Sequence, residues 1–81
     1  MAHITERDVL NAIQDALSPG GKNVTKSSTV KNLEEWDSLG HLGVLAALDT
    51  LFDGKIANIK EMATVDSVER ILQLLREHSL L

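Results

Sequence analysis

Residues 37–54 read DSLGHLGVLAALDTLFDG and predict an amphipathic helix. Asp37 and Ser38, at its start, are both residue types that cap the N-terminus of a helix. Apolar residues then recur at the spacings of three and four positions that are typical of helices: Leu39, Leu42, Leu45, Ala46, Leu48 and Phe52. Asp53 and Gly54 close the segment, so we expect the helix to run from Asp37 and Ser38 to about Phe52.

Two glycines interrupt this predicted helix. Gly40 and Gly43 each cost up to about 1 kcal/mol relative to alanine in a helix interior. A partner protein that approaches closely, and needs these positions without side chains, would offset that cost. The predicted partner face comprises Gly40, His41, Gly43, Val44 and Ala47. Because this face carries few charges, we expect binding to depend weakly on salt and to be impaired by Gly43→Glu.

Helical patterns also occur on both sides of this segment. The first helix is predicted over residues 5–17, with Thr5 as its cap and the Ser-Pro-Gly-Gly run at 18–21 as its stop. Residues 55–63 predict one or two short helical turns, and Thr64 is expected to cap a last helix that frays near His78. The predicted fold is therefore all-α, a small bundle of three main helices plus one short helix, with residues 1–81 as a single domain. Its expected core comprises Leu10, Ile13, Leu42, Leu45, Leu48, Phe52, Val68, Ile71 and Leu75.

A long loop, residues 18–36, separates the first two predicted helices. Loops of this length are uncommon in small domains and often carry function. We expect Val24, Val30 and Leu33 to pin this loop to the core. Trp36, the only tryptophan, is either an anchor of the loop or an exposed partner contact, and anchoring is favoured because tryptophan is usually buried.

The composition excludes several classes of protein. The chain has 81 residues, of which 43% are hydrophobic, and that apolar content argues against disorder. It contains no cysteine, which rules out disulfides and thiolate zinc sites and suits a reducing compartment. The net charge of −4 disfavours nucleic acid as a partner. No apolar run approaches the roughly 20 residues of a membrane span, and the N-terminus has no signal-peptide pattern.

The segment Trp36-Asp37-Ser38-Leu39-Gly40-His41-Leu42, where the long loop meets the second helix, resembles the acyl carrier protein family. The order of the first helix, the long loop, Asp37-Ser38-Leu39 and the last helix extends the resemblance over most of the chain. It implies a covalent 4′-phosphopantetheine on Ser38, with Asp37 and Leu39 beside it. A phosphopantetheinyl transferase, using its own magnesium ion, would move this group from coenzyme A to Ser38.

The same resemblance implies a function. The thiol of the attached arm would carry acyl groups as thioesters, delivered by acyl-loading and acyl-transfer enzymes of lipid, fatty acid, polyketide or related biosynthesis. The protein is then a cytoplasmic, monomeric carrier without catalytic residues, and not itself an enzyme. Fatty-acid carriers usually present acidic residues after the modified serine, whereas this chain has Gly40 and Gly43 there, and Lys60 later. A specialised carrier is therefore expected, and the start methionine and short tail suggest a free-standing one.

The position of Ser38 has a physical interpretation beside this one. A helix N-terminus favours an anion, so a phosphodiester on Ser38 would be stabilised there. The simpler alternative is that Ser38 is an ordinary helix cap.

Two other functions compete with the carrier. One is a small helical protein-interaction domain without a prosthetic group. The other is a minimal hydrolase using Ser38 and His41, which share a helix face at this spacing, although the orienting group and oxyanion hole that such a pair needs are not evident. If Ser38 is a carrier site, His41 is expected to contact the arm, a partner or solvent, while His3 and His78 are expected to be exposed.

Overall fold

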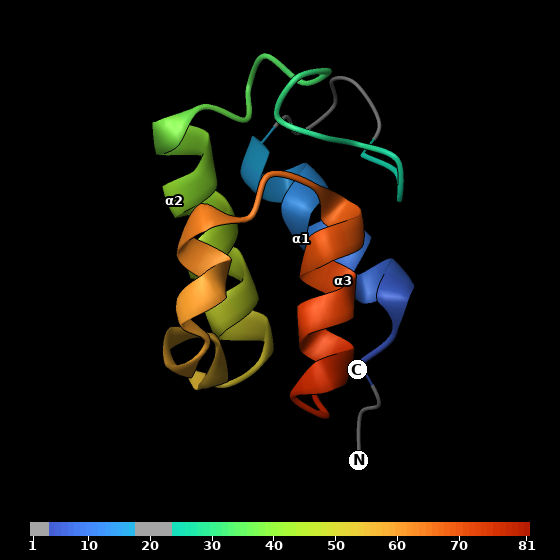
Figure 1. Ribbon diagram of the computed structural model, residues 1–81, viewed down its shortest axis with the longest axis vertical. Coiled ribbons are helices and arrows are strands. Elements are labelled where there is room, and N and C mark those ends of the chain that lie inside the picture. Colours follow the sequence, from blue (N-terminus) through green and yellow to red (C-terminus); the bar gives the residue numbers. More distant parts are fainter. Residues whose placement is uncertain (1–3, 18–23) are drawn as a thin grey trace.

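Three α-helices and two short 3₁₀ helices form the structure, a computed structural model that describes residues 4–17 and 24–81 (Figure 1). In chain order they are α1 (Glu6–Leu17), α2 (Ser38–Leu51), η1 (Lys55–Asn58), η2 (Lys60–Thr64) and α3 (Val68–Glu77). This confirms the predicted all-α bundle with its long loop between the first two helices. The predicted stop at residues 18–21 and His3 lie outside the described residues.

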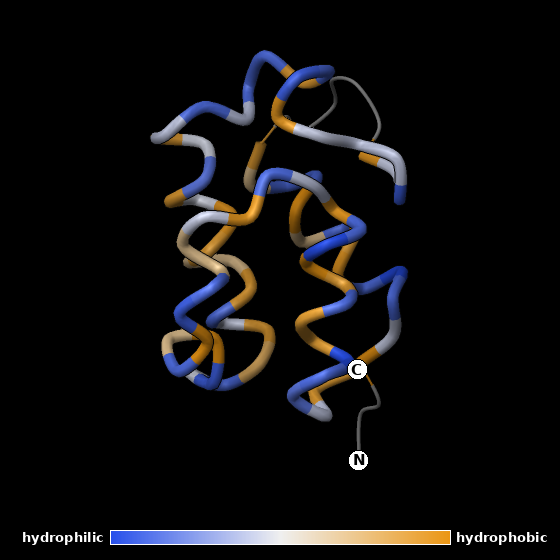
Figure 2. Tube along the Cα trace, viewed as in Figure 1, coloured by the Kyte–Doolittle hydropathy of each residue, from blue (hydrophilic) through white to orange (hydrophobic). Residues whose placement is uncertain are grey.

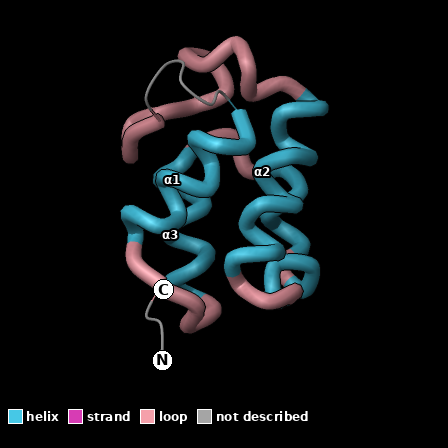
Figure 3. The backbone as a smooth tube through the Cα atoms, turned by 180° about the vertical axis from the view of Figure 1, so that it is seen from behind, coloured by secondary structure: helices cyan, strands magenta, loops and turns pink. Residues whose placement is uncertain are grey.

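The helices are arranged around a shared aliphatic core. α2 and the 3₁₀ helices lie on one side and α3 on the other, with α1 packed against α2 (Figures 1 and 3). Hydrophobic and hydrophilic residues alternate along α1 and α3, whereas most of α2 is hydrophobic (Figure 2). The residues with essentially no exposed surface are Val9, Ile13, Val44, Leu48, Val68, Ile71, Leu74 and Leu75. No helix in residues 4–17 or 24–81 is long and apolar enough to cross a membrane.

The first helix begins where its capping residues predict. The Asp8 backbone N–H donates to Thr5 Oγ1 at 3.3 Å, and the Thr5 N–H donates to Asp8 Oδ2 at 2.9 Å. This reciprocal pair satisfies two of the backbone donors that a helix start leaves open. Thr5 therefore caps α1 as expected.

The last helix begins three residues later than expected. Thr64 belongs to η2, and the cap of α3 is Ser67, whose Oγ accepts from the Arg70 N–H at 3.2 Å. The reason is tertiary pairing, since Val30 N–H donates to Asp66 O at 2.9 Å and Val68 N–H donates to Ser28 O at 3.0 Å. These bonds hold residues 65–67 extended against the long loop, so helical hydrogen bonding starts only after Ser67.

The predicted buried face of α2 is wrong by part of a turn. Leu42 was expected in the core but is 63% exposed, and Leu45 is only half-buried. Val44, expected on the partner face, is fully buried beside Leu48. Apolar residues occur on nearly every side of this helix, so its periodicity does not define one stripe, and the packing of α1 selects the buried side.

Other core predictions are mostly confirmed. Ile13, Leu48, Phe52, Val68, Ile71 and Leu75 are buried, whereas Leu10 is half-buried. Val24 and Leu33 pin the loop as expected, but Val30 is 36% exposed and does not. Trp36 is 3% exposed, which confirms its role as an anchor. Residues of the 3₁₀ segment that the core list omitted also contribute: Ile56, Ile59 and Met62.

The two glycines of α2 face the protein itself and not a partner. A Cβ at Gly40 would overlap the backbone carbonyl oxygen of Glu35. A Cβ at Gly43 would lie 3.6 Å from the Ala16 carbonyl oxygen, in the contact between α1 and α2. Intramolecular packing therefore requires a bare position at Gly40, whereas a Cβ at Gly43 would make only an ordinary contact. The predicted partner face is wrong at Val44, which is completely buried. Because Gly43 lies against α1, Gly43→Glu would place a charged side chain beside this helix contact as well as at the surface, so it does not test a partner surface alone.

An ion-pair cluster joins three distant parts of the chain. Glu6 at the start of α1 pairs with Lys26 of the loop at 2.8 Å and with Arg76 of α3 at 2.6 Å. The hydrogen bond from Lys26, aided by the charge of Arg76, holds the pKa of Glu6 below its usual value of 4.5.

We expect this cluster to make folding stability depend on pH. Because the pKa of Glu6 is lowered by folding, its contribution is complete above the unfolded pKa and is lost as pH falls through the folded pKa. Urea denaturation of the wild type and of Glu6→Gln across the acidic range measures this. The advantage of the wild type should be present at neutral pH and shrink on acidification. An advantage that stays constant down to strongly acidic pH would contradict the pairing.

Candidate functional site

At the start of α2, Asp37 and Ser38 have different roles. Asp37 has extended backbone angles and its Oδ1 accepts from the Gly40 N–H at 2.8 Å, so Asp37 is the N-cap. Ser38 is the first helical residue and is exposed. Within the described residues no hydrogen bond engages the Ser38 hydroxyl. The alternative that Ser38 is an ordinary helix cap is therefore wrong.

The exposed Ser38 hydroxyl lies in a surrounding that suits a bound anion. In the described structure, the backbone N–H groups of Ser38 and Leu39 donate no hydrogen bond. Both lie in the first turn of α2. Open donors at a helix start, together with the helix dipole, attract negative charge. Leu39 itself is 79% exposed and Leu42 is 63% exposed, so apolar side chains project into solvent beside the hydroxyl.

A hydrogen-bonded chain of side chains fixes the loop against the helix just after Ser38. The Trp36 indole N–H donates to His41 Nδ1 at 3.0 Å, and the two rings stack with centroids 6.1 Å apart. His41 Nε2 lies 2.8 Å from the Met62 carbonyl oxygen. Because the indole only donates, His41 Nδ1 must accept, which assigns its proton to Nε2 and makes that atom the donor to Met62. His41 thus ties the long loop and η2 to α2.

This arrangement gives His41 contacts that the sequence analysis did not predict. Its ring contacts Trp36 and Met62, which were not among the anticipated neighbours. Both ring nitrogens are engaged, and no hydrogen bond joins His41 to Ser38 in the described structure. A serine nucleophile needs a base within hydrogen-bond reach, so the geometry does not assemble the Ser38–His41 pair. No group of three or more possible metal-binding side chains occurs in the described residues.

Replacing His41 is expected to loosen this junction. His41→Leu leaves the buried Trp36 N–H and the Met62 carbonyl without partners, which should cost about 1–3 kcal/mol of folding free energy. The single tryptophan reports the change directly, so its fluorescence spectrum should shift along with the urea midpoint. His78→Leu is the matched control, because His78 is exposed and no side-chain hydrogen bond engages it in the described structure. An unchanged spectrum and midpoint in His41→Leu would show that the bridge is absent in solution.

A groove begins at Ser38. We call it the Ser38 groove; it has a volume of about 610 Å³. Its lining comes from the loop, α2 and the segment around the end of η2: Val30, Trp36, Asp37, Ser38, His41, Leu42, Leu45, Ala63, Thr64 and Val65. The exposed Ser38 hydroxyl thus lies in the lining of a largely apolar groove.

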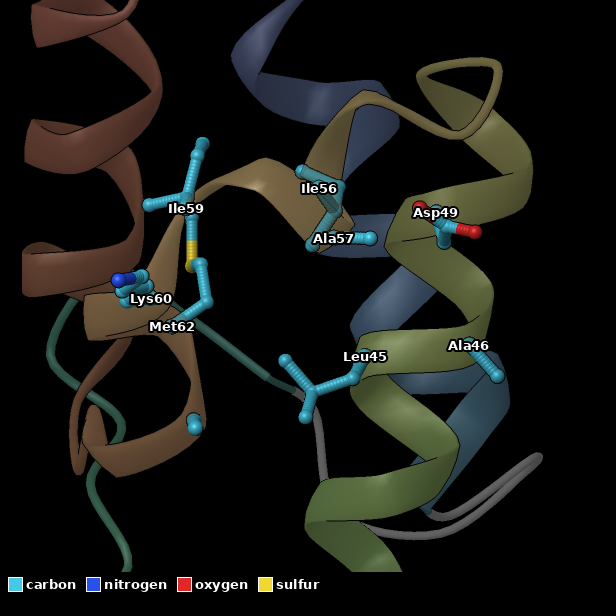
Figure 4. Close-up of a pocket in the computed structure, with 9 residues that line it drawn as sticks. Leu45, Ala46, Asp49, Ile56, Ala57, Ile59, Lys60 and Met62 are labelled. Atoms are coloured by element: carbon cyan, nitrogen blue, oxygen red, sulfur yellow. The ribbon is translucent and has the colours of Figure 1, made fainter.

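A second hollow, the Asp49 cavity, lies between α2 and the 3₁₀ helices and has a volume of about 360 Å³. It is lined by Leu45, Ala46, Asp49, Ile56, Ala57, Ile59, Lys60, Met62 and Ala63. Figure 4 shows Leu45 of α2 directed toward Met62 of η2. Leu45 and Ala63 line both hollows, so the two are neighbours. Sequence reasoning missed this cavity, because its walls are apolar residues that do not differ in type from core residues.

No family model matches the chain, and neither a curated protein nor a solved structure with which it was compared matches it. The interpretation of the site therefore depends on its residues and their geometry. Three consecutive residues at the start of α2 differ in what they do. Asp37 caps the helix, Ser38 presents an unengaged hydroxyl, and Leu39 projects an apolar side chain into solvent.

Proposed function

We propose that the chain is an acyl carrier protein that bears 4′-phosphopantetheine on Ser38. The observation that carries this proposal is the Ser38 hydroxyl, exposed at the first position of α2 and released from capping by Asp37. A side chain in this position is accessible to a modifying enzyme. The resemblance of Asp37-Ser38-Leu39, in its place between the long loop and the second helix, supplies the identity of the group.

The residues around Ser38 fit such a group. The open N–H groups of Ser38 and Leu39 would stabilise a phosphodiester formed at Ser38 Oγ. In that reaction Ser38 Oγ would bond to the phosphorus of the pantetheine phosphate, the pyrophosphate bond of coenzyme A would break with adenosine 3′,5′-bisphosphate as the leaving group, and the hydroxyl proton would be released. When bound, the arm supplies a thiol that carries acyl groups as thioesters. The chain has no cysteine and therefore no thiol of its own.

The two neighbouring hollows support the proposal that the arm carries acyl groups. An acyl chain on the arm is apolar, and burying its surface is favourable by about 25 cal/mol per Å². The Ser38 groove and the Asp49 cavity offer it neighbouring surfaces that are largely apolar. Leu39 and Leu42, exposed beside Ser38, form a surface that acyl-loading and acyl-transfer enzymes would contact. We place this carrier in the cytoplasm, serving a specialised biosynthetic pathway as a monomer.

Intact mass spectrometry tests the proposal. The full chain is incubated with coenzyme A, magnesium and a broad-specificity phosphopantetheinyl transferase, and the mass is compared with an incubation that lacks coenzyme A. One phosphopantetheine per chain, mapped to Ser38 by fragmentation, is expected. A chain that gains no mass while a known carrier is modified in the same tube would overturn the proposal.

The exposed Leu39 and Leu42 also favour the competing function, an interaction domain without a prosthetic group. Two large apolar side chains projecting from one helix form a contact surface whether or not Ser38 is modified. A chain that gains no mass in the incubation would leave this second function as the better one.

A further inference from the structure

The two ring nitrogens of His41 have opposite roles. Nδ1 accepts from the Trp36 indole N–H at 3.0 Å, and Nε2 donates to the Met62 carbonyl oxygen at 2.8 Å. Trp36 is 3% exposed, and no second acceptor engages its indole N–H in the described structure. Both bonds can exist together only while the ring is neutral, because a protonated imidazole has a hydrogen on each nitrogen and cannot accept.

Protonation of His41 would break one of these bonds and keep the other. Nε2 would still donate to Met62, whereas the hydrogen on Nδ1 would face the indole N–H of Trp36. That indole would then be buried without an acceptor, which is unfavourable. The two rings also stack, and stacking favours a cation, but their centroids are 6.1 Å apart, at the outer limit of that attraction. The loss of the hydrogen bond therefore decides the outcome.

The charged side chains around His41 make no contact with its ring. Every element that meets the ring carries exposed charges, and no ion pair or side-chain hydrogen bond joins them to it in the described structure. They are Glu34 and Glu35 of the long loop, Asp37 at the start of α2, and Lys60 and Glu61 of η2. Because charges in water are screened, the hydrogen bonds decide which form of the ring the junction accepts.

We propose that protonation of His41 is a switch that releases Trp36 from the wall of the Ser38 groove. Trp36, His41 and Ser38 all line that groove. In the anchored state the Trp36 ring ties the long loop to α2. In the released state the ring leaves this position while Met62 still holds His41, so the wall beside the Ser38 hydroxyl changes. The switch needs no group on Ser38 and does not depend on the proposed function.

The direction of the pH effect follows from the number of bound protons. The released state binds a proton at His41 that the anchored state excludes, so acidification favours release. An imidazole in water takes up its proton at about pH 6.5. The ratio of released to anchored chains should therefore rise about thirtyfold between about pH 7.5 and about pH 5. Glu6 stays ionised over this range, because the hydrogen bond from Lys26 holds its pKa below 4.5.

Hydrogen exchange of the Trp36 indole N–H measures the switch. This is the proton donated to His41, and the single tryptophan gives one indole signal in the NMR spectrum of the unmodified full chain. Its exchange rate is divided by that of free N-acetyltryptophanamide at the same pH, which removes the intrinsic pH dependence. The resulting protection should fall about thirtyfold between about pH 7.5 and about pH 5. The backbone N–H of Leu75, in the core part of α3, should keep its protection.

Variants assign the effect to His41. In His41→Asn an amide oxygen replaces Nδ1 as the acceptor and takes up no proton, so the protection of the indole should no longer depend on pH. His41→Gln, which also does not titrate, serves if the asparagine variant does not fold. His78→Asn is the matched control, because it removes an exposed histidine and should keep the full change in protection.

Three outcomes would overturn the switch. The first is indole protection that stays constant across this pH range, and the second is a fall that persists in His41→Asn. The third is a parallel loss of protection at Leu75, which would show acid unfolding of the whole domain and not local release. A chain that takes no phosphopantetheine at Ser38 would contradict the proposed function alone.

Discussion

Ser38→Ala will abolish attachment of phosphopantetheine, because no other residue in the described ranges 4–17 and 24–81 offers an unengaged hydroxyl at the first position of a capped helix. The fold should be almost unaffected. Asp37 supplies the cap, so the substitution removes only an exposed hydroxyl, and surface changes of this kind usually alter the free energy of unfolding by less than about 0.5 kcal/mol. Intact mass after incubation with coenzyme A and a transferase measures the first effect, and urea denaturation measures the second.

Ser27→Ala is the matched control for this variant. Ser27 is an exposed serine of the long loop, and no described hydrogen bond engages its hydroxyl. It should be modified as efficiently as the wild type. A Ser38→Ala chain that still gains a phosphopantetheine would show that the attachment site lies elsewhere. A large loss of stability in Ser38→Ala would show instead that Ser38 takes part in capping.

Leu48→Ala will have the largest effect on folding among the leucines of α2. Leu48 is completely buried, and truncating such a side chain removes about 2–5 kcal/mol of folding free energy. Domains of this size have a small core and marginal stability, so much of the Leu48→Ala population should be unfolded at ambient temperature. Circular dichroism during urea denaturation measures both the midpoint and the residual helix.

Leu42→Ala on the same helix isolates the role of burial. Leu42 is 63% exposed, so the same truncation should cost well under about 1 kcal/mol. The sequence periodicity places both leucines in the core and predicts equal effects. Equal destabilisation by the two variants would therefore support the phase predicted from the sequence and contradict the structure.

Signals that act within a few residues were sufficient to predict the helices and the place of the candidate site. Thr5 marks the start of α1, because a cap bonds to backbone groups only three positions away. The Asp37–Ser38 pair marks the start of α2 for the same reason. The exposed serine at the junction of loop and helix thus follows from local order along the chain. Which of the two residues caps did not follow, since both types can.

Contacts between distant residues decided the rest. The cap of α3 is Ser67, and not Thr64 as the sequence predicts, because residues 65–67 pair with the long loop. The sequence around Thr64 does not indicate this pairing. The buried face of α2 depends on where α1 approaches Gly43, since a helix with apolar residues on most sides does not define its own inner face. His41 found its second partner in a backbone carbonyl at Met62, which no side-chain pattern encodes.

Asp49 also shows which features follow from local sequence and which depend on contacts between distant residues. The sequence by itself determined that an acidic residue follows Ser38 after three helical turns, because helix geometry sets that spacing. Only the tertiary structure decided that one oxygen of this carboxylate, Asp49 Oδ1, would be buried. Its surroundings come from η1 and η2, whose packing against α2 depends on the core as a whole, and burial in that apolar wall leaves Oδ1 without a partner.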